Sequence, residues 1–170
     1  MPAKVRCRYL VENVNGAWHG DIHYIIRSLK TMYIFCLMDD RSRYIVGYGI
    51  FDTKTAKNVK NVFQNVIKTN GVKPLAFWSD NGLENIAREM KVYLNENNIH
   101  QILTLPGNPQ SNGKIERFWR ELDKHIDGLQ SWPSIQRGIE NFVEFYNYIG
   151  PATSGLRISK CATKNSLSCH

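Results

Sequence analysis

The hydrophobic period of the chain changes at Thr55, and this change limits the folds that the sequence can adopt. Before Thr55, three short apolar runs over 16–24, 31–38 and 43–51 have the length and composition of β-strands. After it, apolar residues recur at helical spacing up to Gly71, a residue type common just past a helix end. We therefore expect three strands in an antiparallel meander, followed by a helix with Thr55 as its N-cap.

Strand and helix patterns alternate after this first helix. The predicted elements are a fourth strand over 73–80, a helix over 83–97, a short fifth strand over 99–103, a helix from Lys114 and a last helix over 134–148. The segment 105–113 is rich in Pro, Gly and Asn, so we expect it to be irregular. This order predicts an α/β fold in which helices pack on a five-stranded mixed sheet.

Length, charge and cysteine content favour a one-domain intracellular protein. The chain has 170 residues, with 22 Lys and Arg against 15 Asp and Glu, so it suits one domain and a polyanionic partner such as DNA. Its four cysteines form no CxxC pair, which is typical of reduced thiols in an intracellular protein. Neither a signal-peptide pattern nor a membrane-length apolar run is present, so we expect no secretion and no membrane partner. The predicted organisation is a lead-in over 1–15, a core over 16–150 and a tail over 151–170 that is loop or disordered.

Three acids stand where a predicted strand stops or a predicted helix starts: Asp21, Asp80 and Glu116. Their carboxylate oxygens are the ligands that hard divalent cations prefer. The three acids therefore predict a divalent-metal site. Asp39 and Asp40 read as a turn rather than as ligands. The histidines that flank Asp21 have no nearby Cys or His partners, which argues against structural zinc.

The helix that carries Glu116 is predicted to have two distinct faces. One face is apolar and packs on the core; it contains Ile115, Phe118, Leu122 and Ile126. The opposite face is basic, and Glu116 lies at the border between the two. The basic residues form either a solvated face or a row of DNA phosphate contacts, and we favour the second interpretation for Lys114, Arg117, Arg120 and Lys124. Gln110 and Asn112, just before them, either touch DNA bases or sugars or only shape the loop.

Five motifs together resemble, in order and spacing, the catalytic core of retroviral-type integrases and related transposases, over residues 16 to 150. The gap of 35 residues between Asp80 and Glu116 is also the spacing of that family. The motifs are Trp18-His19-Gly20-Asp21, Asp39-Asp40-Arg41-Ser42-Arg43, Ser79-Asp80-Asn81-Gly82, Pro109-Gln110-Ser111-Asn112-Gly113-Lys114-Ile115-Glu116-Arg117 and Tyr146-Asn147. The resemblance implies a ribonuclease-H-like fold with strand order 3-2-1-4-5 and flanking helices.

The resemblance also implies the activity: a polynucleotidyl transferase of a mobile element that cleaves DNA ends and transfers strands. Asp21 would bridge two Mg²⁺ or Mn²⁺ ions, Asp80 would hold one of them and Glu116 the other. Relatives act as core dimers, so we expect a homodimer or higher oligomer, formed through surfaces that include Trp132 and Phe142. A nuclear location follows if the host is a eukaryote.

The chain departs from the family pattern in three places. It starts just before the first core strand, without the zinc-binding domain that often precedes the core, and it ends before any C-terminal DNA-binding module. Pro151 is followed by Ala152 where many relatives have a Pro-His pair. A second function therefore stays open: a domesticated or fragmentary copy that binds DNA or other chains without catalysis. A general ribonuclease-H-like nuclease is a third, because it shares the implied fold and metal ions.

Overall fold

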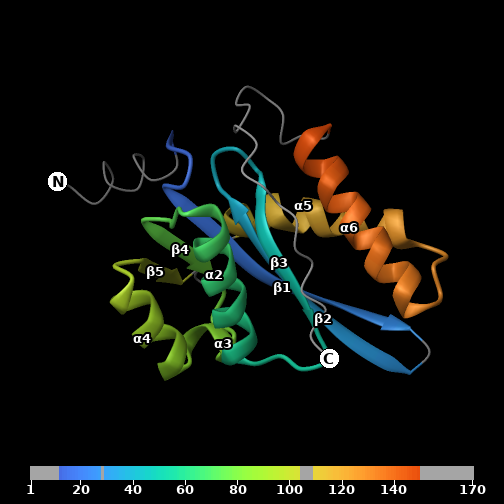
Figure 1. Cartoon of the computed structure of the whole chain (residues 1–170), viewed down its shortest axis with the longest axis horizontal. Coiled ribbons are helices and arrows are strands. Elements are labelled where there is room, and N and C mark those ends of the chain that lie inside the picture. Colours follow the sequence, from blue (N-terminus) through green and yellow to red (C-terminus); the bar gives the residue numbers. More distant parts are fainter. Residues whose placement is uncertain (1–11, 28, 104–108, 150–170) are drawn as a thin grey trace.

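The computed structural model describes residues 12–27, 29–103 and 109–149 (Figure 1). The predicted tail, and the predicted lead-in up to residue 11, lie outside these ranges. The structure contains five strands and five helices of at least one turn within the described residues. They are β1 (Ala17–Arg27), β2 (Lys30–Asp39), β3 (Ile45–Phe51), α2 (Ala56–Asn70), β4 (Ala76–Ser79), α3 (Leu83–Ile86), α4 (Arg88–Glu96), β5 (His100–Leu103), α5 (Pro109–Ile126) and α6 (Trp132–Tyr148).

The five strands form one mixed sheet in the order β3-β2-β1-β4-β5. β1 pairs antiparallel with β2, and β2 pairs antiparallel with β3, so the predicted meander is confirmed. β4 lies parallel to both β1 and β5. The strand order 3-2-1-4-5 that the motifs imply is therefore confirmed, and β1 is the central strand of the sheet.

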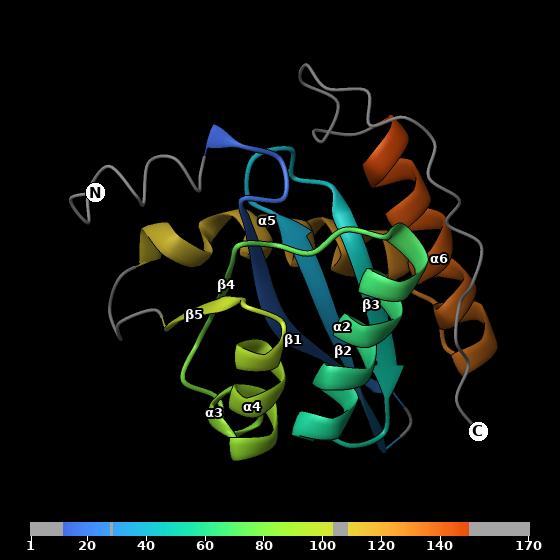
Figure 2. The ribbon, with the colours of Figure 1, turned by 60° about the vertical axis from the view of Figure 1, so that its left-hand side comes forward.

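Helices cover both faces of this sheet (Figure 2). On one face, α2 and α4 pack over a core that includes Trp18, Phe35 and Phe63. On the other face, α5 and α6 pack over a second core that includes Phe118 and Phe142. Because successive side chains of a strand point to opposite faces, β1 and β2 supply apolar side chains to both cores.

The first helix begins and ends where the sequence predicts. The Thr55 side chain accepts a hydrogen bond from the Asn58 N–H, which is the N-cap interaction. Gly71 has a φ of 67°, in the left-handed region that glycine adopts without a steric penalty, and its N–H bonds to the Ile67 carbonyl.

The two largest differences from the predicted elements concern helices. The helix predicted over 83–97 is broken into α3 and α4 at Ala87, whose ψ of 144° is extended rather than helical. The segment predicted to be irregular up to Gly113 is helical from Pro109. A proline costs nothing in the first turn of a helix, because its missing N–H would have no partner within the helix.

The surface predicted for self-association also needs correction. Phe142 is only 5% exposed and packs against Phe118 in the core beneath α6, so its side chain is not on the surface. Trp132 is partly buried against the same core, with the Lys30 ammonium 5.9 Å from its ring. Within the described ranges, no helix has the length and apolar character needed to cross a bilayer.

Candidate active site

Asp21 lies on the face of β1 that is turned toward α5. Alternate residues of a strand share a face, so His19, Asp21 and His23 lie on the same side. Trp18 and Ile22 pack in the opposite core, under α2 and α4. A side chain at Gly20 would point into the same core, because a Cβ atom added there would lie 2.4 Å from Cε2 of Phe77. The lack of a side chain at Gly20 therefore lets the Phe77 ring pack directly against the β1 backbone next to Asp21.

The pairing of β1 with β4 brings Asp80 next to Asp21. The two strands are parallel, with Trp18 level with Phe77 and His19 level with Trp78. Continuing this register by two residues makes Asp80, just after the end of β4, level with Asp21. Neighbouring strands lie about 4.8 Å apart, so the two carboxylates come from adjacent backbone positions. The sequence prediction that these two acids meet is consistent with this register.

Electrostatics around Asp21 support the same proximity. Burial raises the pKa of the Asp21 carboxyl group, and repulsion from the Asp80 carboxylate raises it further. Two hydrogen bonds oppose the rise: Trp119 Nε1 donates to Oδ2 at 2.8 Å, and the Ile22 N–H donates to Oδ1 at 2.9 Å. Asp21 is thus a largely desolvated acid with a second acid beside it.

Asp80 is exposed, and its position is fixed by the turn that follows β4. Its Oδ1 accepts hydrogen bonds from the Gly82 N–H at 2.9 Å and from Asn85 Nδ2 at 2.8 Å. Both donors belong to the segment that begins α3 or leads into it. The start of α3 therefore orients the Asp80 carboxylate.

Glu116 comes from α5, the helix that is bonded to Asp21 through Trp119. Glu116 and Trp119 are three positions apart on α5, so they lie on neighbouring parts of the helix surface. Glu116 itself is exposed. Among the residues that the structure describes, no three His, Cys, Asp or Glu side chains are grouped closely enough to hold a metal ion. The structure thus brings two of the three predicted acids together and leaves Glu116 outside that group.

A buried acid, Asp40, joins three elements next to this site. Its Oδ1 lies 2.8 Å from His19 Nε2 on β1 and 2.6 Å from Lys114 Nζ on α5, with Arg43 Nη1 at 3.8 Å. Burial by itself raises the pKa of Asp40, but hydrogen bonds from His19 and Lys114 outweigh burial and lower the pKa to about 2. The charged Asp40 side chain therefore links β1, through His19, to α5, through Lys114. Lys114 lies two residues before Glu116.

A turn follows β2 from Asp40, as predicted, and Asp39, the last residue of β2, holds the shape of this turn. The Asp39 side chain is fully buried; its Oδ2 accepts hydrogen bonds from the N–H and the hydroxyl of Ser42, and its Oδ1 accepts one from the Asn15 N–H. Among the described residues, neither histidine beside Asp21 belongs to a group of three side chains that could hold a metal ion. His19 pairs with Asp40, and His23 Nε2 lies 2.8 Å from Asp123 Oδ1.

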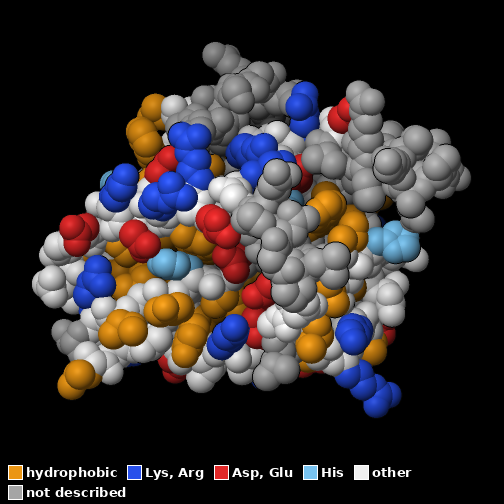
Figure 3. Space-filling model, turned by 180° about the vertical axis from the view of Figure 1, so that it is seen from behind, with side chains coloured by type: hydrophobic (Ala, Val, Ile, Leu, Met, Phe, Trp, Pro, Cys, Tyr) orange, Lys and Arg blue, Asp and Glu red, His pale blue; other side chains and the backbone are white. Residues whose placement is uncertain are grey.

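The four basic residues predicted to contact DNA differ in their surroundings. Lys114 is turned inward to Asp40, and Arg117 Nε donates to Glu121 Oε1 at 2.9 Å. Arg120 and Lys124 are exposed on α5. Seen from behind, Lys and Arg side chains gather on the surface beside a group of Asp and Glu (Figure 3). Gln110 and Asn112 lie in the first turns of α5, but their side chains are outside what the structure describes.

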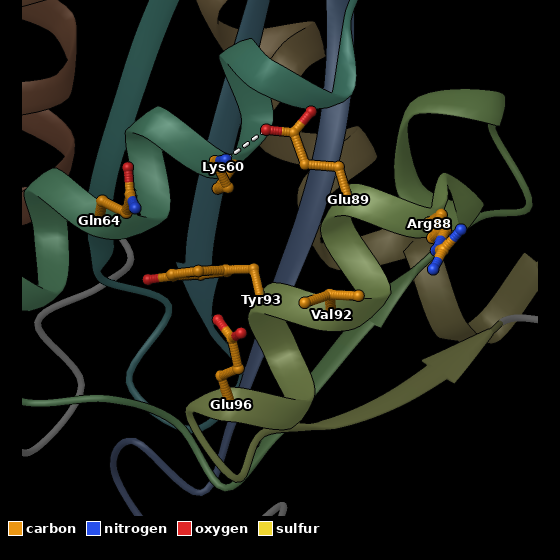
Figure 4. A pocket seen from close by; sticks show the side chains of 7 residues that line it. All are labelled: Lys60, Gln64, Arg88, Glu89, Val92, Tyr93 and Glu96. Carbon is orange, nitrogen blue, oxygen red and sulfur yellow. Dashed lines mark hydrogen bonds and ion pairs between the residues drawn. The ribbon is translucent and has the colours of Figure 1, made fainter.

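A shallow depression of about 390 Å³ lies between α2 and α4, on the other side of the sheet from α5 (Figure 4). Lys60 and Glu89 form an ion pair across it. None of the three predicted acids lines it, so this depression is separate from the candidate site. Its lining residues are Lys60, Gln64, Arg88, Glu89, Val92, Tyr93 and Glu96.

Sequence reasoning missed two residues that organise the site. Trp119 was not singled out, although its position three residues after Glu116 puts it on the same part of the helix. For Asp40, the sequence predicts only a turn. Its pairing with Lys114 joins positions 74 residues apart, and no local pattern signals such a contact.

Comparison with known proteins agrees with the fold. A family model described as "Integrase core domain" matches residues 12–109, and a second model with the same description matches residues 97–154. The putative integrase ORF3 of Spiroplasma virus SpV1-C74 is 27% identical over 168 residues, which cover 85% of this chain and 46% of the viral protein. The transposase for transposon Tn552 of Staphylococcus aureus is 26% identical over 130 residues, which cover 71% of this chain and 27% of that protein. The chain thus spans less than half the length of these relatives.

Solved structures share the fold. The catalytic core domain of HTLV-2 integrase, solved in complex with magnesium in a trimeric form, has a TM-score of 0.65 and 18% identity, covering 80% of this chain and 87% of that one. The simian T-cell lymphotropic virus intasome, in complex with the PP2A regulatory subunit B56 gamma, has a TM-score of 0.71 and 16% identity, covering 94% of this chain and 61% of that one. The sheet is therefore ribonuclease-H-like, as the motifs imply.

Proposed function

The chain belongs to the integrase core domain family, and from this premise we propose that it is a polynucleotidyl transferase that cleaves DNA ends and joins them to a target strand. One observation carries the proposal: Asp21 on β1 lies beside Asp80, just after the end of the neighbouring parallel strand β4, so that their carboxylates repel each other, and Asp21 is bonded to the helix that carries Glu116. The same three residues are the acids that the sequence motifs single out.

The carboxylate oxygens of Asp21 and Asp80 are suitable ligands for a hard divalent cation. A desolvated carboxylate beside a second carboxylate is unfavourable without an opposite charge, and Mg²⁺ or Mn²⁺ supplies that charge through oxygen ligands. We infer that Asp21 and Asp80 hold the metal, with two ions per site once Glu116 takes part. The HTLV-2 core, which has a similar fold, was solved with magnesium. When bound, the ions would activate the attacking oxygen and stabilise the leaving one.

The position of Glu116 indicates that the metal site is not complete in the free protein. Hydrogen bonds hold Asp21 at both of its oxygens, and the turn before α3 holds Asp80 at Oδ1, whereas the structure does not group Glu116 with the two aspartates. We infer that Glu116 joins the two aspartates when the start of α5 settles on DNA and metal. Completion of the site on substrate binding would limit hydrolysis in the absence of DNA.

DNA is proposed to run along the exposed basic side of α5. Each of Arg120→Ala and Lys124→Ala should weaken binding to all sequences alike, because a phosphate contact carries no sequence information. Each should also reduce the slope of log affinity against log salt by about one unit. Fluorescence anisotropy with a labelled duplex across a salt series measures both quantities.

Two comparisons make this salt experiment specific. Lys68→Ala removes an exposed positive charge from α2, in the opposite helix layer, and should leave the slope unchanged. Lys114→Ala tests whether the lysine bound to Asp40 also contacts phosphate, because loss of an internal pair alone changes stability and not the slope. Slopes for Arg120→Ala and Lys124→Ala equal to that of Lys68→Ala would mean that DNA binds elsewhere.

A non-catalytic role is the second candidate function, and the exposed position of Glu116 outside any metal-holding group favours it. Such a copy would bind DNA with the predicted salt dependence and join no ends. The purified protein incubated with labelled DNA ends and Mg²⁺ or Mn²⁺ separates the two functions. Hydrolysis of RNA in an RNA–DNA hybrid without any joining would instead identify a general nuclease.

We also propose self-association, because concerted joining of two DNA ends requires two active sites. The HTLV-2 core was solved in dimeric and trimeric forms. With Phe142 in the core, the exposed apolar residues of α6 are Phe145 and Tyr148. Sedimentation that detects only monomer at high protein concentration, with and without DNA, would contradict this proposal.

A further inference from the structure

Trp119 connects the central strand to α5 at the acid itself. Its side chain is only 5% exposed, and its Nε1–H donates to Asp21 Oδ2 at 2.8 Å. An indole nitrogen can donate a hydrogen bond but cannot accept one. The contact therefore persists only while Asp21 presents this oxygen as an acceptor, which a carboxylate does.

The indole ring is held from two sides. The His23 ring stacks on it, with centroids 5.0 Å apart and an interplanar angle of 14°, and Phe118 packs against it at 4.9 Å and 63°. His23 is in turn bonded to Asp123 on α5. His23 follows Asp21 by two residues on β1, and Asp123 follows Trp119 by four on α5, so two parallel contacts join the same strand to the same helix.

Both oxygens of the Asp21 carboxylate are thereby fixed. Trp119 holds Oδ2, and the Ile22 N–H holds Oδ1. A carboxylate has about four lone-pair positions, so each oxygen keeps room for a further ligand. With both oxygens held, the carboxylate cannot rotate freely, and its remaining lone pairs have a set direction.

We propose that Trp119 is a positioning residue: its indole N–H fixes the orientation of the Asp21 carboxylate and sets the register of α5, and with it Glu116, against β1. This inference rests on the proposed function. Trp119 would touch neither metal nor DNA; it would act through Asp21. Partners that orient a metal ligand typically change metal affinity or activity by about 10- to 100-fold when removed.

Two substitutions separate the hydrogen bond from packing. Trp119→Phe keeps a large aromatic ring and removes the N–H. Trp119→His loses ring size, but its five-membered ring can present an Nε2–H close to where the indole N–H lies. If Trp119 positions Asp21, joining activity and Mg²⁺ affinity by calorimetry should fall about 10- to 100-fold in Trp119→Phe and recover substantially in Trp119→His.

Thermal unfolding should give the opposite order, with Trp119→Phe more stable than Trp119→His, because the larger ring fills more of the core. A purely packing role predicts that activity and Mg²⁺ affinity follow stability, and this result would overturn the inference. Trp132→Phe on α6 is the matched control: it also removes an indole N–H from a partly buried ring, and it should keep wild-type Mg²⁺ affinity. Wild-type protein that joins no ends under either metal would overturn the proposed function instead.

A second measurement, by NMR, is made on the wild-type protein. It needs Trp119→Phe only to assign one resonance. The indole N–H resonance of Trp119, identified by its loss in Trp119→Phe, should move as Mg²⁺ saturates the protein, because its acceptor is the metal ligand. The resonance of Trp132 should stay in place. A Trp119 resonance that does not respond to saturating Mg²⁺ would overturn the positioning role, whatever the activity of the variants.

Discussion

Asp80→Asn is expected to reduce strand transfer about a thousandfold, because metal stabilisation of the transition state contributes several kcal/mol and each 1.4 kcal/mol changes the rate about tenfold. The substitution should spare the fold. An asparagine keeps the oxygen that accepts hydrogen bonds from the Gly82 N–H and Asn85 Nδ2. The loss should appear with Mg²⁺ and with Mn²⁺, measured as joined product from labelled DNA ends.

The matched control is Glu96→Gln, which also converts an exposed acid to its amide but lies on α4, in the opposite helix layer. It should keep wild-type activity. The affinity of Asp80→Asn for DNA should also stay close to that of the wild type, because the acid is proposed to serve the metal and not the phosphates. Equal joining by Asp80→Asn and wild type would show that Asp80 is not a catalytic residue.

Asp40→Asn is expected to lower the free energy of unfolding at neutral pH by about 2 kcal/mol, the equivalent of a pKa that falls from its usual 3.8 to about 2. The amide carries no charge for His19 and Lys114 to pair with. Because the folded-state pKa is depressed, this stabilisation is complete above about pH 4 and is lost as the pH falls toward 2.

Urea unfolding at a series of pH values measures this contribution. The wild-type protein should lose stability more steeply than Asp40→Asn between pH 4 and pH 2, so the two curves should converge in that window. Glu144→Gln, which neutralises an exposed acid on α6, should follow the wild-type curve. A constant difference between wild type and Asp40→Asn over the whole range would mean that the charge of Asp40 does not stabilise the fold.

Local patterns were sufficient to predict most of the strands and helices, whereas the strand order followed from the family resemblance. The cap at Thr55 and the left-handed Gly71 define α2 from the sequence alone, because both act through neighbouring backbone groups. The prediction failed where a local signal was ambiguous. Proline and glycine in 105–113 suggested a loop, yet Pro109 is acceptable in a first helical turn. Ala87, at which the second helix breaks, is a strong helix former and gives no warning.

The site divides in the same way between local and long-range information. Asp21 and Asp80 could be paired in advance because each stands in or after an apolar run that predicts a strand, and β1 and β4 prove to be neighbours. The bonds from Trp119 to Asp21 and from Lys114 to Asp40 join residues 98 and 74 positions apart. Such contacts depend on how α5 crosses the sheet, which helical periodicity alone does not determine.

This dependence changes how the basic residues of α5 are understood. Helical spacing groups Lys114 with Arg117, Arg120 and Lys124, and the sequence offers no reason to separate them. In the structure, Lys114 neutralises a buried acid, whereas Arg120 and Lys124 stay exposed. A charge that is already paired inside the protein contributes less to a salt-dependent interaction with DNA than one that faces solvent.

Crystals soaked in Mn²⁺ test most directly whether Asp21 and Asp80 form a metal site, because anomalous scattering locates the ion without reference to activity. We expect a peak at coordination distance from a carboxylate oxygen of each aspartate, about 2 to 2.2 Å. Asp80→Asn crystals treated identically should lose or weaken it. Mn²⁺ bound only at other surface acids, or wild-type and Asp80→Asn maps with the same peak, would show that Asp21 and Asp80 do not form a metal site.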